Sequence, residues 1–398
     1  MKILIVICDL KIGGGQTAVA RLARGLAANN LVYIYEYHTS LPQISESVLS
    51  LLPDNVEVIR LPPFFDWFGH KISGLLNKLR IRKDAWLLIK ELHFKLFVTF
   101  HNIEIVNTHL YYADEFATKA LENFKVPIVL TDHGDYRYVI KEDISTPSRV
   151  QKIFNRVDRV IYVSDSNAES LSNYINCTNH GTKIYYGMPQ PIVNRYGHTA
   201  REKLGIRDDF VFGMVARGIP EKGWAEAIEA FRNVHLSTSH NAHLILVGAS
   251  AYLSNLEQEI EAAMQPFIHF VGHSSDPNYW IESFDVGLLP TYFPGESLPN
   301  SVIEYLSLGK PVIATNVGGI SELIDFAEKK AGILIDLTEG ATSDTRAMTA
   351  AMLNYLNDTA LLEHHSKLAQ KAFEKFSFDK CLESYQKVFA EMISGRTK

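Results

Sequence analysis

The chain has 398 residues, of which 46% are hydrophobic and 21% are charged, so it can bury the cores of two domains. Its formal net charge of -6 argues against a general nucleic-acid-binding protein. The three cysteines, Cys8, Cys177 and Cys381, are widely spaced and form neither a metal motif nor an even disulfide set, which indicates a reducing compartment.

The first half of the sequence alternates short apolar runs with amphipathic stretches. The apolar runs predict strands at 2–7, 31–37, 104–109, 127–131 and 159–164, and the stretches between them predict helices at 16–29, 113–124, 148–157 and 166–175. This alternation is typical of a parallel sheet with helices on both faces. Because no apolar run reaches the roughly 18 residues of a membrane helix, we expect a soluble, cytoplasmic protein.

The second half repeats this pattern. Strands are predicted at 210–216, 242–248, 268–272, 285–290, 311–315 and 332–336, and helices at 223–234, 254–264, 301–308, 320–324 and 376–393. The sequence therefore predicts an α/β protein with two Rossmann-like, doubly wound parallel-sheet domains that face each other across a cleft.

The expected domain boundaries follow from the break between the first set of predicted strands and helices and the second set. The first domain is expected at 1–190 and the second at 191–375, with a linker near 188–200, where Pro189 and Pro191 disfavour regular structure. Residues 376–398 are expected to form a C-terminal helix that packs back toward the first domain.

Ligands of such sheets bind beyond the carboxyl ends of the strands, so residues that follow predicted strands are the candidates for a site. Gly13, Gly14 and Gly15 follow the first strand, where backbone amides can approach a phosphate or a sugar. The glycines are consecutive, whereas a dinucleotide fingerprint needs G-x-G-x-x-G, so a dehydrogenase is the weakest interpretation. The alternative for this loop is a tight turn without a ligand.

Two histidines lie at the carboxyl ends of predicted strands of the first domain: His109 ends the strand at 104–109, and His133 stands just past the strand at 127–131. A single histidine in such a place is more often structural than functional. Two at the strand ends of one sheet favour a functional interpretation, more strongly for His133 than for His109. Asp135 and Arg137 follow His133 in the same segment.

In the second domain, Arg217 follows a strand and Lys222 stands five residues later at a predicted helix start. A lysine at a helix N-terminus is poorly placed for the helix dipole unless an anion binds there. Arginine can act as a bidentate clamp and lysine as a point charge, so the two can hold a diphosphate. The alternative is a pair of solvated loop cations.

The segment PGESLPNSVIEYLSLGKPVIATNVGG, residues 294–319, places Glu296 in a loop and Glu304 about one turn inside a helix. The free amides at this helix start can accept a phosphate, and the glutamates on either side can accept hydrogen bonds from hydroxyl groups. A nucleotide-sugar has this layout, with ribose hydroxyls, a diphosphate and sugar hydroxyls in a row. The helix-start residues are Ser297, Leu298, Pro299 and Asn300.

These segments resemble the motifs of glycosyltransferase family 4. GESLPNSVIEYLSLGKPVIATNVGGISELI is similar to its Glu-x7-Glu signature, ARGIPEKGW to its R-x4-K-G donor loop, IGGGQTAVARLARGL to its glycine loop and LTDHGDYR to its T-x-H-x segment. The resemblance is strong over about 205–335 and weaker over most of 1–190. It implies the GT-B fold and a retaining, metal-independent hexosyltransferase that needs no cofactor, and the sequence has no Asp-x-Asp metal motif.

The resemblance also implies roles for the matching residues. Glu304 would bind the donor ribose, and Glu296 would face the donor sugar. Arg217 and Lys222 would hold the diphosphate, helped by the backbone of 297–300. His133 would contact the transferred sugar near the reaction centre, and residues 13–15 would close over the phosphates or the acceptor. His109, Asp135 and Arg137 are the candidates on the acceptor side, and no metal site is expected.

Two departures from the family pattern bear on the substrate. Gly218 stands where a leucine or similar residue is common, and the Glu296 loop reads ESLPN rather than EGFG. The expected donor is a UDP-sugar, with a GDP-sugar as the alternative, and the expected acceptor is a glycan or a lipid-linked sugar in surface polysaccharide or glycolipid biosynthesis. The competing interpretations are a nucleotide-sugar epimerase on a similar scaffold and a non-catalytic nucleotide-sugar-binding protein.

Residues 62–98 mix aromatic residues with many lysines and arginines. A basic amphipathic helix of this composition can lie on an anionic membrane, which would place the protein on the inner face of the membrane as a peripheral protein. The alternative is a domain helix with a solvated basic face.

Overall fold

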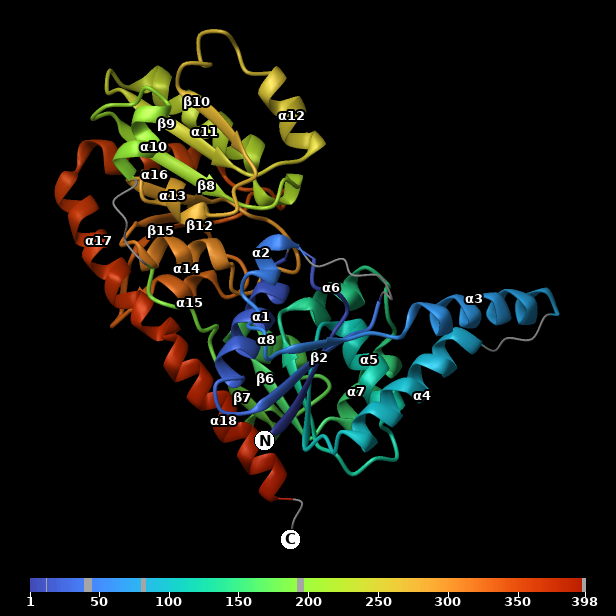
Figure 1. The fold of residues 1–398 in the computed structure, drawn as a ribbon. Coiled ribbons are helices and arrows are strands. Elements are labelled where there is room, and N and C mark those ends of the chain that lie inside the picture. Colours follow the sequence, from blue (N-terminus) through green and yellow to red (C-terminus); the bar gives the residue numbers. More distant parts are fainter. Residues whose placement is uncertain (12, 39–44, 80–83, 192–196, 396–398) are drawn as a thin grey trace. The chain divides into compact units, whose positions relative to one another are not determined.

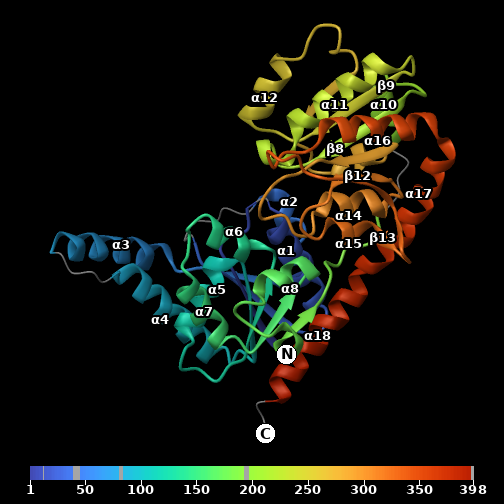
Figure 2. The same ribbon diagram turned by 180° about the vertical axis from the view of Figure 1, so that it is seen from behind.

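The structure is a computed structural model that describes residues 1–11, 13–38, 45–79, 84–191 and 197–395. The chain divides into two compact units. Unit 1 comprises Met1–Gly187 and Phe378–Lys398, and unit 2 comprises Met188–Ser377. Figure 1 shows the course of the chain through both units, and Figure 2 shows it from behind.

Unit 1 contains a seven-stranded sheet in the order β3–β2–β1–β4–β5–β6–β7, in which all neighbouring strands are parallel. The strand order reverses between β1 and β4, which makes the carboxyl ends of these two strands the switch point of the sheet. The strands are β1 (Lys2–Ile7), β2 (Leu31–Glu36), β3 (Glu57–Ile59), β4 (Ile105–His109), β5 (Ile128–Asp132), β6 (Arg159–Tyr162) and β7 (Gly181–Lys183).

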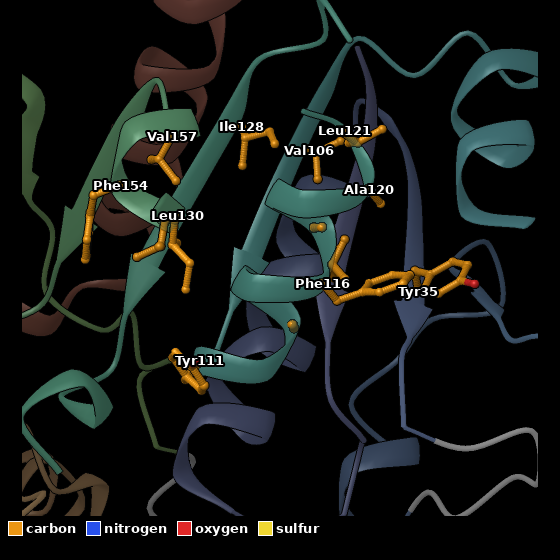
Figure 3. Packing of buried hydrophobic residues seen from close by; sticks show 14 of the residues in the cluster. Tyr35, Val106, Tyr111, Phe116, Ala120, Leu121, Ile128, Leu130, Phe154 and Val157 are labelled. Carbon is orange, nitrogen blue, oxygen red and sulfur yellow. The ribbon is translucent and has the colours of Figure 1, made fainter. Parts of the chain in front are cut away.

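Helices cover both faces of this sheet because successive strand residues point to opposite sides. On one face, Ile3, Ile5 and Ile7 of β1 pack with α1 and α18. On the other face, the core contains Phe116 of α5 and Tyr35 of β2, whose ring centroids are 6.0 Å apart (Figure 3). The helices are α1 (Gly14–Leu26), α2 (Glu46–Leu49), α3 (Pro63–Lys78), α4 (Ala85–Phe100), α5 (Tyr111–Ala120), α6 (Asp135–Lys141), α7 (Pro147–Arg156), α8 (Asp165–Leu171), α9 (Cys177–His180) and α18 (Phe378–Ser394).

Helix α18 belongs to unit 1 although it ends the described chain. Its Tyr385 is buried and donates a hydrogen bond to Thr131 of β5 at 3.4 Å. At the start of α18, the ring of Phe378 lies so close to Gly25 of α1 that a Cβ on this glycine would be 2.7 Å from the Cζ of Phe378. The absence of a side chain at Gly25 therefore lets the two helices approach each other.

Helices α3 and α4 form an arm that extends away from the sheet of unit 1 (Figures 1 and 2). The two helices pack where Gly69 meets Trp86, and the indole of Trp86 donates a hydrogen bond to Asp66 Oδ1 at 2.8 Å. Most of the exposed large apolar side chains in the described part of the chain lie on this arm: Phe64, Phe65, Trp67, Phe68, Leu75, Leu79, Leu88, Leu92, Leu96 and Phe100. Of the helices described, none combines the length and the apolar character needed to cross a bilayer.

Unit 2 contains a second, six-stranded parallel sheet in the order β10–β9–β8–β11–β12–β15. Its switch point lies between β8 and β11. The strands are β8 (Phe210–Val215), β9 (Ala242–Val247), β10 (Ile268–Gly272), β11 (Val286–Leu289), β12 (Val312–Thr315) and β15 (Gly332–Ile335), and β13 (Asp325–Phe326) pairs with β14 (Lys329–Lys330). The helices are α10 (Gly197–Lys203), α11 (Trp224–Ser237), α12 (Ala251–Gln258), α13 (Pro277–Ile281), α14 (Asn300–Ser307), α15 (Ile320–Ile324), α16 (Thr345–Asn357) and α17 (Thr359–Phe373).

The two parallel sheets confirm the predicted fold class. The short edge strands β3 and β7 were not predicted, because each has three residues and no marked apolar run. The predicted helix at 254–264 lies instead at Ala251–Gln258, where the Ser250 side chain caps its start. The segment expected as a linker, 188–200, already contains the start of helix α10 at Gly197, while 192–196 lie outside the described residues.

Candidate functional site

The switch point of unit 2 brings together two loops that the sequence analysis singled out. One loop follows β8 and ends in a 3₁₀ turn, Pro220–Lys222, and the other follows β11 and leads to α14. Because β8 and β11 are adjacent and parallel, both loops start at the same edge of the sheet. The predicted residues Arg217, Lys222 and Glu296 all lie in these loops.

Lys222 and Glu296 form a buried ion pair in which Lys222 Nζ lies 2.5 Å from Glu296 Oε2. Each side chain is only 8% exposed. The hydroxyl of Thr291 donates a further hydrogen bond to the same carboxylate oxygen at 2.8 Å. Lys222 is therefore not a solvated loop cation. Its ammonium group is buried, and a carboxylate from the neighbouring loop compensates its charge.

Several residues that the sequence analysis missed hold these two loops in place. Gly223 has a φ of 82°, and a Cβ on it would lie 2.0 Å from the carbonyl oxygen of Pro290, so only glycine fits after Lys222. Thr291 is fully buried, and its hydroxyl oxygen also lies 3.2 Å from the carbonyl oxygen of Glu221. Ser343 donates to the carbonyl of Pro290. A small hydroxyl residue directly after an apolar strand was the only local signal for Thr291.

Arg217 is exposed, and its guanidinium carbon lies 5.1 Å from the ring centroid of Phe293. Lys222 Nζ lies 5.2 Å from the same ring, so one aromatic side chain faces both predicted cations. The indole nitrogen of buried Trp224 donates to the carbonyl of Arg217 at 2.9 Å and anchors the backbone from which the arginine extends.

The structure explains the departure at Gly218. A Cβ at this position would lie 2.5 Å from the hydroxyl of Ser250, 2.8 Å from its Cβ and 2.9 Å from the carbonyl oxygen of Ala249. The loops after β8 and β9 thus approach too closely for a larger side chain. The close packing of these two loops therefore accounts for a glycine at position 218, where the family pattern has a larger residue.

The loop that carries Glu296 is held from a third side by the glycines after β12. Gly319 donates its amide to the carbonyl of Ser297 at 2.9 Å, and Gly318, with a φ of 57°, would place a Cβ 2.3 Å from the carbonyl oxygen of Glu296. Helix α14 then begins at Asn300, which puts Glu304 in its second turn with a half-buried side chain. The predicted helix start of 297–300 is therefore next to the Lys222–Glu296 pair.

In unit 1, the glycine loop and the two histidines meet near the switch point between β1 and β4. Gly13 is the N-cap of α1, which begins at Gly14, earlier than the expected start at residue 16. A Cβ on Gly15 would lie 3.8 Å from His133 Cγ, so the glycine backbone runs close to the histidine ring. The structure thus brings together two motifs that lie more than a hundred residues apart in the sequence.

His109 and His133 are directly hydrogen-bonded, with 2.9 Å between His109 Nδ1 and His133 Nε2. Burial lowers the pKa of His133 to about 4, and burial next to His133 lowers the pKa of His109 well below the usual value for histidine. Both rings are therefore neutral at neutral pH. The other nitrogens bond to Asn107 and Tyr186, two partners that the sequence analysis missed.

Asp135 and Arg137 lie in helix α6, but their side chains lie outside the described part of the structure. Across the described residues, no three His, Cys, Asp or Glu side chains are grouped so as to hold a metal ion.

Two family models match the chain. Residues 12–187 match the model described as Glycosyltransferase Family 4, and residues 209–358 match the model described as Glycosyl transferases group 1. The first match covers the glycine loop and His133 of unit 1, and the second covers Arg217, Lys222, Glu296 and Glu304 of unit 2.

Individual known proteins are similar as well. An uncharacterized glycosyltransferase of Methanocaldococcus jannaschii is 22% identical over 340 residues, which span 85% of this chain and 86% of that protein. The capsular polysaccharide biosynthesis glycosyltransferase CapM of Staphylococcus aureus is 27% identical over 197 residues, or 48% of this chain and 49% of CapM. The crystal structure of Anabaena HepE in complex with UDP and glucose has the same fold, with a TM-score of 0.76 at 19% identity over 98% of this chain and 100% of HepE.

Proposed function

We propose that this chain, which belongs to glycosyltransferase family 4, transfers a hexose from a nucleoside-diphosphate donor, with retention and without a metal ion, to a glycan or a lipid-linked acceptor. The observation that carries the proposal is the buried Lys222–Glu296 pair beside Arg217 at the switch point of unit 2. Two cations for a diphosphate and a carboxylate for sugar hydroxyls lie there on two adjacent loops.

The donor side of the proposed mechanism rests on unit 2. Arg217 and Lys222 bind the diphosphate and stabilise the negative charge that develops on it as it leaves. Backbone N–H groups within 297–300, at the start of α14, contribute further contacts to the phosphates. Lys222 and Thr291 both bind Oε2 of Glu296, so we assign the other oxygen, Oε1, to a hydroxyl of the donor sugar. Glu304 binds the ribose hydroxyls.

The remaining roles fall to unit 1. His133 contacts the transferred sugar, and the backbone of 13–15, which runs against its ring, closes over the phosphates or the acceptor. His109 bonds to His133 and is buried, so it acts through His133 rather than on the acceptor directly. Asp135 and Arg137 are the acceptor-side candidates.

The relatives support the choice of substrates. CapM takes part in capsular polysaccharide biosynthesis, and the HepE crystal holds UDP and glucose. By analogy we propose a UDP-sugar as the donor, with a GDP-sugar as the alternative, and a role in surface polysaccharide or glycolipid biosynthesis.

We also propose that the α3–α4 arm contacts an anionic membrane surface on which a lipid-linked acceptor is presented. The start of α3 exposes Phe64, Trp67 and Phe68, and Lys71 Nζ lies 4.0 Å from the Trp67 ring centroid. Residues 62–98 hold seven lysines and arginines against three acids, in a chain with a net charge of -6. Apolar burial and the attraction of basic residues to anionic lipids act together on such a surface.

The first test is nucleotide binding. We would measure thermal shifts and calorimetric affinities for UDP, GDP, ADP and their sugars, without metal, on the wild type, on Glu304→Ala and on Glu339→Ala, which changes an exposed acid of unit 2. Stabilisation by one nucleotide that is lost only in Glu304→Ala supports the donor site and identifies the base. If none of these compounds binds wild-type protein, the proposal fails. Donor epimerisation in the absence of acceptor would favour an epimerase.

A further inference from the structure

A chain of hydrogen bonds links four side chains at the carboxyl ends of β4 and β5. Asn107 Oδ1 lies 2.8 Å from His109 Nε2, and His109 Nδ1 lies 2.9 Å from His133 Nε2. The chain continues from His133 Nδ1 to the hydroxyl of Tyr186 at 2.7 Å. Asn107 and His109 are buried, so water cannot serve as their hydrogen-bond partner. The two side chains must therefore satisfy each other's hydrogen-bonding groups.

The orientation of the Asn107 amide is determined by its other two contacts. Its Nδ2 lies 2.9 Å from the carbonyl oxygen of Val129 and 3.1 Å from the hydroxyl of Thr131. A carbonyl oxygen can only accept a hydrogen bond, so the atom that faces Val129 must be the NH2 group. The atom that faces His109 is therefore the amide oxygen, which can only accept.

The Asn107 oxygen, as an acceptor, determines which atom donates in every hydrogen bond that links the four side chains. His109 Nε2 must carry a proton to donate to Asn107, and because a neutral imidazole has one proton, His109 Nδ1 is an acceptor. His133 then donates from Nε2 to His109, which leaves His133 Nδ1 as an acceptor. The hydroxyl of Tyr186 donates to that nitrogen.

Donation in the opposite direction, from His109 to His133, would lose the hydrogen bond between His109 and Asn107. If His133 carried its proton on Nδ1, its Nε2 would need a proton from His109 Nδ1. A neutral His109 would then turn an unprotonated Nε2 toward the Asn107 oxygen, and two acceptors would face each other at 2.8 Å in a buried site. A doubly protonated His109 would avoid this, but burial disfavours the charged ring.

The backbone around His109 is also unusual. Leu110, the next residue, has a φ of 71° and a ψ of 140°, which is a rare conformation for a leucine and one that costs free energy. Costly backbone conformations of this kind tend to cluster at functional sites. The Leu110 side chain faces the glycine loop, since a Cβ on Gly15 would lie 3.5 Å from Leu110 Cδ2.

We propose that Asn107 and His109 are positioning residues that hold His133 in the Nε2–H tautomer, so that Nδ1 accepts a hydrogen bond from a hydroxyl group. In this structure the hydroxyl is that of Tyr186, and during the reaction it is a hydroxyl of the transferred sugar. The part that concerns the sugar rests on the proposed function, whereas the tautomer of His133 does not. This arrangement favours a sugar that carries a hydroxyl group at this position. A sugar with only an acceptor there, such as a fluorine, could not donate a hydrogen bond to His133 Nδ1.

The tautomer can be measured on the wild-type chain. Protein labelled with 15N-histidine gives long-range 1H–15N correlations that distinguish a protonated Nε2 from a protonated Nδ1, and His133→Gln identifies the signals of His133 among the 15 histidines. We expect a single proton on Nε2 of His133 at neutral pH. A proton on Nδ1, or on both nitrogens, would overturn the proposal. This result would come from the wild-type protein, so no substitution could account for it.

Two substitutions of His109 test whether the tautomer affects transfer. His109→Phe removes the acceptor for His133 Nε2–H, so we expect both tautomers to appear and kcat to fall about tenfold. His109→Asn retains an acceptor oxygen close to the place of Nδ1, so it should restore the Nε2–H tautomer and most of kcat. Tyr385→Phe, which removes a neighbouring buried hydroxyl, should leave the tautomer unchanged.

The outcomes separate this proposal from the proposed function. Full kcat in His109→Phe, with mixed tautomers, would show that His109 is only structural while donor binding stands. A fall in kcat that His109→Asn does not restore, although its tautomer is wild-type, would also overturn the positioning role. Failure of the chain to bind any nucleotide-sugar would refute the proposed function and the sugar contact, but the tautomer measurement would still decide the Asn107–His109 arrangement.

Discussion

Lys222 Nζ lies 2.5 Å from Glu296 Oε2, although the two residues are 74 positions apart in the sequence, and both side chains are buried. A buried ion pair contributes little when compared with an apolar pair, but the loss of one partner leaves an uncompensated charge in the interior. A substitution that tests the proposed donor site at either residue is therefore expected to change stability as well.

We expect Glu296→Ala to lower the free energy of unfolding by about 3 kcal/mol, because Lys222 would remain buried without its counter-ion. Combining it with Lys222→Met should recover most of that loss, although the double variant should be inactive. Urea denaturation followed by tryptophan fluorescence would give the coupling energy from the double-mutant cycle. Additive effects of the two substitutions would contradict a direct ion pair.

Gly223→Ala should be much more disruptive than Gly205→Ala. Both glycines have a left-handed backbone, with φ of 82° and 72°, but a Cβ on Gly223 would lie 2.0 Å from a carbonyl oxygen while Gly205 has open space around it. Gly205→Ala should cost only the backbone penalty of about 1–2 kcal/mol. Gly223→Ala should cost more and should weaken donor binding through Lys222. Thermal unfolding and nucleotide titration of both variants would check this, and similar losses in the two would refute the clash.

Acid should destabilise unit 1 through His133. Burial lowers its pKa to about 4, against about 6.5 in an unfolded chain, so between these values the unfolded chain binds a proton that the folded chain does not. Stability should therefore fall as the pH falls from about 6.5 toward 4, by at most about 1.4 kcal/mol per pH unit for this group.

His133→Phe removes this titration, so its melting temperature should fall less than that of the wild type between pH 7 and pH 5. The exposed His240 provides a control, because His240→Gln should keep the wild-type slope. A wild-type slope in His133→Phe would mean that other groups account for the acid sensitivity.

The α3–α4 arm should bind anionic vesicles and lose that binding when its aromatic side chains are removed. We expect flotation with phosphatidylglycerol vesicles, weaker flotation with phosphatidylcholine, and a marked loss in Phe64→Ser combined with Trp67→Ser. Leu236→Ser removes an exposed apolar side chain from α11 and should have no effect. If the wild type does not float but elutes as a dimer that the double substitution dissociates, the arm is a self-association surface instead.

The predicted site residues depended on a rule about position. Arg217, Lys222 and Glu296 are predicted as site residues because polar residues after apolar strands stand out, and parallel strands gather such residues at one edge of the sheet. Asn107 and Tyr186 were missed for different reasons. Asn107 lies inside strand β4, so the rule about residues that follow strands does not select it, and Tyr186 lies in a segment without a motif.

The alternation of apolar strands and amphipathic helices is a local property with a fixed period, so the two parallel sheets and the loops that carry the charged residues can be predicted from the residues alone. Which of these residues are partners becomes apparent only from the folded chain. Lys222 meets Glu296, and His133 meets both His109 and Tyr186, across 74, 24 and 53 positions of the chain. These pairings follow from the order of the strands and from the packing of the loops between them, and no local pattern of residues encodes either.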